Sequence, residues 1–177
     1  MTRKEVIILK NINIRTLCRV SVLIALEIVL ERFLSIQTPF LRIGLGFVPL
    51  ALCGIMYGPY WAAAAGGIAD ILGAFIAGLG FYPPITLTAI LAGLCFGLFL
   101  HEKNARFFPN IVLCTLISTV GLSLFLQSYW LSLILPNMQT YMAVVSSRLV
   151  QCGVLVLLYL VMIPLLQKLA IRLENLK

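Results

Sequence analysis

The chain has 177 residues, of which 62% are hydrophobic and only 11% are charged, and its mean hydropathy is +1.08. Soluble domains are about 45–50% apolar, so this composition excludes a soluble protein and predicts one embedded in lipid. The net charge of +7 does not indicate nucleic-acid binding, because the basic residues flank apolar segments, as they do beside membrane helices.

The apolar segments predict six membrane-spanning helices, since one span takes about 20 residues. Residues 1–13 form a short cytoplasmic arm, and the apolar stretch after them is too long for the core of a signal peptide. Gly58-Pro59 predicts a tight turn between the second and third spans. We therefore expect an all-α membrane protein with one integral membrane domain, residues 1–177, and spans at residues 14–34, 44–57, 60–79, 85–100, 107–127 and 141–169.

The distribution of Lys and Arg predicts the orientation of these spans. Ten of these residues fall on one side and only Arg32, Arg42 and Arg148 on the other. Because cytoplasmic loops carry the excess of positive charge, both termini are expected in the cytoplasm. The loops at residues 35–43, 78–84 and 128–140 then face outward.

Three ionisable residues are predicted to lie at a similar depth in the membrane. At about 1.5 Å per residue, Glu27 and Arg148 lie about 10 Å, and Asp70 about 14 Å, below the outer ends of their spans. Charges in a membrane are costly and typical of functional sites, so we expect an outward-facing cavity for a polar ligand. Gln151, one turn from Arg148, would add a donor and an acceptor. The alternative is that Glu27 or Asp70 pairs with Arg148 and only joins helices.

Other candidate ligand contacts lie near the outer ends of the spans. Arg32 and Arg42 either contact a ligand or extend to lipid headgroups. Phe40, Phe81 and Tyr82 either stack on a ligand or anchor the chain at the membrane interface.

Small residues predict close helix packing at two places. In the third span they recur every three or four residues, at Ala62, Gly66, Ala69, Gly73 and Ala77, which makes one helix face small. In the first span, Ser21 and Ala25 would admit either a helix of another membrane protein or a helix of the same chain.

The sequence contains no pattern typical of catalysis or metal binding. It lacks a G-x-x-x-x-G-K-[ST] phosphate-binding loop, Asp70 is its only aspartate, and His101 has no nearby nucleophile. The five cysteines form no C-x-x-C pair. We predict no catalytic residue, no metal, no cofactor and no enzymatic activity, and we expect a partner protein to supply any energy for transport.

Two segments, RIGLGFVPLALCGIMYGPYWAAAAGGIADILG (residues 42–73) and FYPPITLTAILAGLCFGLFL (residues 81–100), resemble the substrate-capture S components of energy-coupling factor (ECF) vitamin transporters, and within them the folate-specific branch. The resemblance implies six helices in a prokaryotic plasma membrane and a T scaffold subunit with two ABC-type ATPases as partners. It also implies that the protein topples in the membrane to deliver its vitamin. In the first helix, Ser21 and Ala25 correspond to the family's A-x-x-x-A scaffold contact, with Ser21, also a small residue, in place of the first Ala. At Pro83-Pro84-Ile85-Thr86 this chain departs from the Pro-Gly-Phe-Thr of folate relatives, a change that stiffens the outer gate and removes an aromatic residue.

Folate is consistent with the residues that the sequence singles out. A carboxylate, Asp70 or Glu27, could accept hydrogen bonds from the pterin edge, and Arg32, Arg42 or Arg148 could hold the carboxylates of the glutamate tail. Uptake of the vitamin would be driven by ATP, which the partner ATPase subunits would use. The alternatives are an S component for another vitamin or nucleobase-like ligand, such as pantothenate, a stand-alone facilitator or channel, and a scaffold without a ligand.

Overall fold

The computed structural model describes residues 14–37, 42–78, 82–101, 108–134 and 141–174. Almost all of them are helical. The elements are α2 (Ile14–Arg32), β1 (Ile36–Gln37), β2 (Arg42–Ile43), α3 (Phe47–Tyr57), α4 (Pro59–Ile76), α5 (Pro83–Leu100), α6 (Phe108–Leu116), the π-helix η2 (Ile117–Leu126), α7 (Gln127–Ile134) and α8 (Tyr141–Glu174).

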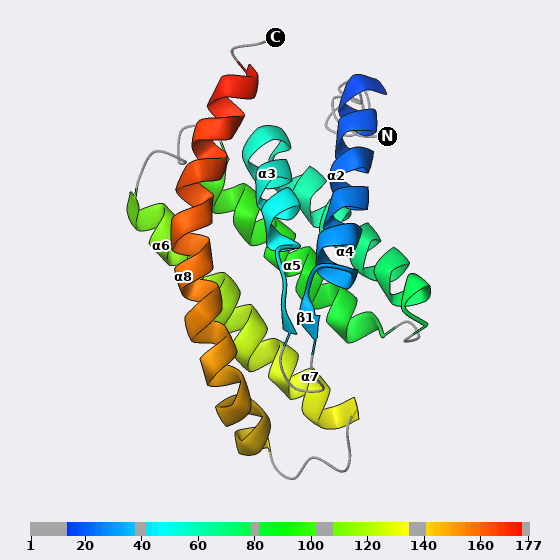
Figure 1. The fold of residues 1–177 in the computed structure, drawn as a ribbon, viewed down its shortest axis with the longest axis vertical. Coiled ribbons are helices and arrows are strands. Elements are labelled where there is room, and N and C mark those ends of the chain that lie inside the picture. The colour runs from blue at the N-terminus through cyan, green and yellow to red at the C-terminus, as the bar shows by residue number, and fades with distance from the viewer. Residues whose placement is uncertain (1–13, 38–41, 79–81, 102–107, 135–140, 175–177) are drawn as a thin grey trace, which may run out of the picture.

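The helices form one bundle (Figure 1). α4 packs along α5, α3 packs against α2, α4, α5 and α8, and the rod made by α6, η2 and α7 runs beside α8. α2 begins and α8 ends at the same, upper end of the bundle, which is compatible with termini on one side of a membrane.

Four helical segments are long and apolar enough to cross a membrane, namely Pro59–Ile76, Pro83–Leu100, Pro109–Trp130 and Gln151–Ala170. The sequence predicts six spans, and the two that fall outside this set are α2 and α3. α2 has 19 residues but carries several charges, and α3 has only 11 residues, about 16 Å of helix. The bundle is thus an all-helical membrane fold with a small two-stranded hairpin.

Glycines let α5 lie almost in backbone contact with its neighbours. A Cβ at Gly93 would collide with the carbonyl of Ala62 in α4, and one at Gly97 would collide with Pro59. The predicted small face of α4 is confirmed for its first four residues, which are buried, whereas Ala77 is exposed just after the helix ends.

Three local features differ from the sequence-based expectation. Within the predicted outer loop, residues 35–43, the strands β1 and β2 pair in antiparallel fashion. Ile36 lies opposite Ile43, and Gln37 lies opposite Arg42. Helix continues to Ile134, although a loop was predicted from residue 128, because the apolar sequence there packs on η2 and α8. Residues 117–126 are π-helical, and hydrophobic periodicity does not distinguish that form from an α-helix.

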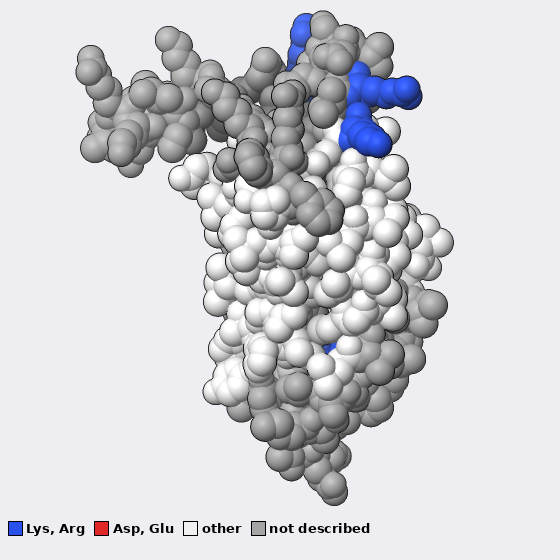
Figure 2. All heavy atoms as spheres, turned by 90° about the vertical axis from the view of Figure 1, so that its left-hand side faces the viewer, with Lys and Arg blue, Asp and Glu red and all other residues white. Residues whose placement is uncertain are grey.

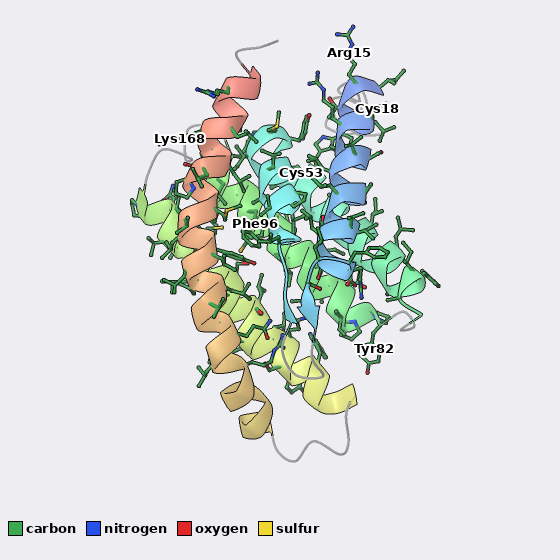
Figure 3. All side chains as sticks on the ribbon, viewed as in Figure 1. Arg15, Cys18, Cys53, Tyr82, Phe96 and Lys168 are labelled. Carbon is green, nitrogen blue, oxygen red and sulfur yellow. The ribbon has the colours of Figure 1, made fainter. Side chains whose placement is uncertain are left out.

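The described surface agrees with a membrane setting. On the face in Figure 2 the broad middle is almost entirely uncharged, and Lys and Arg gather at one end. Figure 3 places Arg15 and Lys168 toward that same end and Tyr82 toward the other. Large side chains such as Phe75, Leu157 and Val161 are more than half exposed, as expected for a lipid-facing surface.

Candidate functional site

A cavity of about 170 Å³ lies between the helices. The structure brings Glu27, Asp70, Arg148 and Gln151 to its wall, from α2, α4 and α8. The cavity's polar lining is completed by Glu31, Thr88, Ser118, Ser123, Gln127 and Tyr159.

Acidic residues form the wall contributed by α2 and α4. Glu27 and Glu31 are four residues apart, so they lie on one face of α2. Glu27 is only 5% exposed, and Glu31 and Asp70 lie near enough for their charges to act on it. Within the described part of the chain, no residue donates a hydrogen bond to Glu27. Its carboxylate is therefore available to a ligand's N–H groups.

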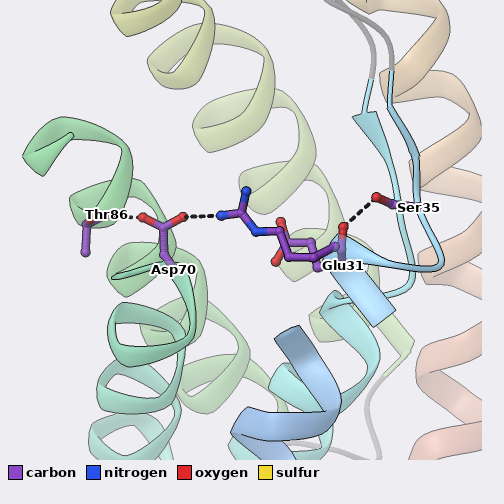
Figure 4. Close-up of polar contacts among 5 residues, drawn as sticks. Glu31, Ser35, Asp70 and Thr86 are labelled. Atoms are coloured by element: carbon purple, nitrogen blue, oxygen red, sulfur yellow. Dashed lines mark hydrogen bonds and ion pairs between the residues drawn. The ribbon is translucent and has the colours of Figure 1, made fainter. Parts of the chain in front are cut away.

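Asp70 instead holds three helices together (Figure 4). Its Oδ1 lies 3.8 Å from Arg32 Nη2 of α2, and its Oδ2 accepts a 2.8 Å hydrogen bond from Thr86 Oγ1 of α5. Arg32 passes over Gly73, where a Cβ would lie 2.7 Å from its Nε. The alternative was that Glu27 or Asp70 pairs with Arg148; instead Asp70 pairs with Arg32, and among the described residues neither Glu27 nor Arg148 forms an ion pair.

Arg148, only 4% exposed, is surrounded by neutral acceptors. Its Nε, Nη1 and Nη2 donate to Gln151 Oε1 (3.4 Å), Ser128 Oγ (3.5 Å) and Gln127 Oε1 (3.2 Å). Among the described residues, no carboxylate forms an ion pair with it. Neutral acceptors orient the guanidinium but leave its positive charge uncompensated, so the site favours an anion.

Aromatic rings form the apolar part of the cavity. The Tyr159 ring lies 4.1 Å from that of Phe47 and 5.7 Å from that of Phe96, measured between centroids. Phe96 is almost fully buried, near the middle of the bundle in Figure 3. Cys53, Leu100 and Ile163 belong to the same hydrophobic core as these rings and are fully buried.

The remaining predicted residues lie elsewhere. Tyr82 precedes α5, is 41% exposed and does not line the cavity. Arg42 lies in β2, where the structure describes only the backbone, while Phe40 and Phe81 lie outside the described residues. Ser21 and Ala25 are both exposed on α2.

Sequence reasoning missed several residues of this site. The spacing of Glu31 from Glu27 was a usable signal, since residues four apart share a helix face. Gln127 and Ser128 were assigned to the end of a span and to a loop, and Thr86 gave no signal as the partner of Asp70. Among the described residues, no cluster of His, Cys, Asp and Glu could hold a metal ion.

Comparison with known families identifies the chain. Residues 15–171 match the family model described as "ECF transporter, substrate-specific component". The chain belongs to this family. As an S component it is part of a transporter and not an enzyme, in agreement with the sequence-based prediction.

Individual relatives and solved structures resemble this S component over most of its length. It is 37% identical to the folate transporter FolT of Clostridium novyi (strain NT), over 71% of this chain and 72% of the relative. It is 32% identical to FolT of Leuconostoc mesenteroides, over 68% of this chain and 65% of the relative. The crystal structure of FolT bound with folic acid matches with a TM-score of 0.81 and 30% identity, covering 88% of this chain and 94% of that one.

The fold is also shared with a more distant protein. The S component for biotin from an ECF-type ABC transporter matches with a TM-score of 0.68, covering 96% of this chain and 94% of that one. Its identity to this chain is 18%, so this likeness concerns the fold alone.

Proposed function

We propose that this S component captures folate from outside the cell for ATP-driven uptake. The observation that carries the proposal is the cavity, where an acidic residue without a described partner, Glu27, and an uncompensated cation, Arg148, line the same space. The FolT relatives and the FolT structure with folic acid support folate as the ligand.

Folate matches the chemistry of these walls. Its pterin edge carries adjacent N–H donors that one carboxylate can accept, and its tail carries carboxylates that a guanidinium can hold in pairs. We assign Glu27 to the pterin edge and Arg148, oriented by Gln151, to the tail. Asp70 and Arg32 support the wall through their ion pair. Phe47 and Tyr159 offer ring faces for stacking.

Roles for the residues outside the cavity complete the proposal. Arg42 is a further candidate for holding the carboxylates of the tail. The aromatic residues Phe40, Phe81 and Tyr82 either stack on a ring of the ligand or close the outer gate. Ser21 and Ala25, which are small and exposed on α2, form the contact with the scaffold subunit.

The proposed transport cycle depends on other chains. The partners are a transmembrane T subunit and two ABC-type ATPases, which use the ATP, and the S component topples against the T subunit to release folate inward. It needs no cofactor of its own. Residues 1–177 act as one membrane domain with six spans in a prokaryotic plasma membrane and both termini in the cytoplasm, where the basic residues gather.

The test is folate titration of the purified chain and of three variants, Glu27→Gln, Asp70→Asn and Arg148→Ala. We expect the unmodified chain to bind folate and the Glu27 and Arg148 variants to bind it more weakly. Unchanged affinity in all three variants would remove the cavity as the site. Pantothenate, titrated in parallel, separates folate from the other vitamin considered.

A further inference from the structure

The π-helix η2 occupies ten residues, Ile117–Leu126, in the middle of a membrane-crossing rod. π-helices have i→i+5 hydrogen bonds, are rare, and are mostly single turns that occur frequently at functional sites. Here the π-helical segment runs along the cavity, so its effect on which residues face the ligand can be followed residue by residue.

The π-helical turn places Ser118, Ser123 and Gln127 on the same wall of the cavity. Ser118 and Gln127 are nine positions apart, which is two and a half turns of an α-helix with about 3.6 residues per turn, so there they would point in opposite directions. With about 4.4 residues per turn, as i→i+5 bonding implies, nine positions make about two turns. The π-helix therefore aligns them.

The same change turns two aromatic residues away from the cavity. Phe125 and Tyr129 lie seven and eleven positions after Ser118, about two and three turns of an α-helix, so α-helical geometry would place them beside it. In the structure they are 53% and 50% exposed and do not line the cavity. An α-helical rod would thus present bulky rings where the cavity now has polar groups.

Two of the aligned residues have contacts that suit a binding site. Ser123 lines the cavity, and no described residue forms a hydrogen bond with its hydroxyl. Gln127 lines the cavity and accepts the 3.2 Å hydrogen bond from Arg148 Nη2. Ser123 can therefore bond a ligand directly, and Gln127 can act on it through Arg148.

We propose that the π-helical geometry of η2 determines specificity in this S component. It presents Ser123 as a hydrogen-bonding contact for the polar heteroatoms of the ligand and Gln127 as a positioning residue for the guanidinium of Arg148. The inference rests on the proposed function for the identity of the ligand, and it adds two residues that sequence reasoning did not assign.

Accessibility of single cysteines tests the geometry. In the full chain with its five native cysteines replaced by alanine, Ser123→Cys and Gln127→Cys should react with a small water-soluble methanethiosulfonate, and folate should slow the reaction. Phe125→Cys and Tyr129→Cys should react little, because they face lipid. Reaction at 125 and 129 but not at 123 and 127 would overturn the proposal.

Measurements of folate affinity test the proposed roles of Ser123 and Gln127. Ser123→Ala should weaken folate binding about threefold to tenfold through loss of one hydrogen bond, while the matched control Phe125→Ala should leave it unchanged. Gln127→Ala should weaken folate binding but not the binding of a pterin that lacks the carboxylate tail, a difference that general destabilisation would not produce. Equal losses for both ligands, or no loss in Ser123→Ala, would contradict these roles.

The outcomes separate this inference from the proposed function. If positions 123 and 127 react as expected but the unmodified chain binds no folate and folate gives no protection, the π-helical geometry is supported and the identity of the ligand is wrong.

Discussion

Two carboxylates near each other in the bundle have opposite surroundings. Asp70 has a cation and a hydroxyl as partners, whereas Glu27 is buried beside like charges with no described hydrogen-bond donor. A carboxylate in the second situation is destabilised until a ligand supplies donors. The sequence did not show which acid forms the ion pair and which is available to a ligand, because both residues are predicted at a similar depth in the membrane.

The first prediction contrasts the two acids. Glu27→Gln should weaken folate binding about tenfold to a hundredfold, as expected for loss of hydrogen bonds to a charged group worth about 1.5–3 kcal/mol, with no fall in thermal stability. Asp70→Asn should mainly lower the midpoint of thermal unfolding, because it leaves Arg32 without its counter-charge. Titration calorimetry and thermal unfolding in detergent measure the two effects. Weaker folate binding in Asp70→Asn together with lower thermal stability in Glu27→Gln would contradict this assignment.

The second prediction concerns the cation. Arg148→Ala should weaken folate binding about a hundredfold but change little for a pterin without the glutamate tail, since only the tail offers carboxylates. Arg148→Lys should recover part of the loss, because a lysine keeps the charge but not the paired geometry. Equal losses of affinity for both ligands would show that Arg148 contacts the pterin or stabilises the fold, and does not bind the tail.

At the scale of elements, close contacts of α5 position the cavity wall. α5 carries Thr86 and Thr88 near its start and Phe96 near its end, and its close contact with α4 at Ala62 requires that Gly93 has no side chain. The cavity geometry therefore depends on backbone contacts away from the polar residues.

The third prediction tests this contact. Gly93→Ala should destabilise the bundle by about 1–3 kcal/mol, because the added methyl group meets the Ala62 carbonyl and the helices must separate. Gly153→Ala is the matched control, since Gly153 is exposed on α8 and a Cβ there would have nothing within 4 Å. Thermal unfolding in detergent compares them. Equal stabilities would show that the close approach is not needed.

For the whole molecule, the distribution of exposed residues separates the proposed ligand site from the proposed contact with the partner. The cavity lies inside the bundle, and Ser21 and Ala25 are on the outer face of α2. Changes on that outer face should therefore leave ligand binding intact.

The fourth prediction uses this separation. Ala25→Trp should prevent co-purification with a T subunit and ATPases and abolish ATP-driven folate uptake in liposomes, while folate binding by the isolated chain stays unchanged. Leu157→Trp, at a lipid-facing position of α8 that is 67% exposed, is the control and should not affect assembly. Loss of folate binding in Ala25→Trp, or ATP-driven uptake by it, would contradict the assignment.

Composition and spacing alone determined that the chain belongs in a membrane, four of the five residues predicted for the small face of α4, and that Glu27, Asp70, Arg148 and Gln151 are candidate site residues. These conclusions follow from properties that act along the chain, namely the cost of placing charges in lipid and the periodicity of a helix. Only the tertiary structure decided that Asp70 pairs with Arg32, that Arg148 is held by neutral side chains, and that a π-helix turns Ser123 and Gln127 toward the cavity. Pairings between distant helices, and the switch from α-helix to π-helix, depend on how the helices pack. Hydrophobic periodicity along the sequence predicts neither of them.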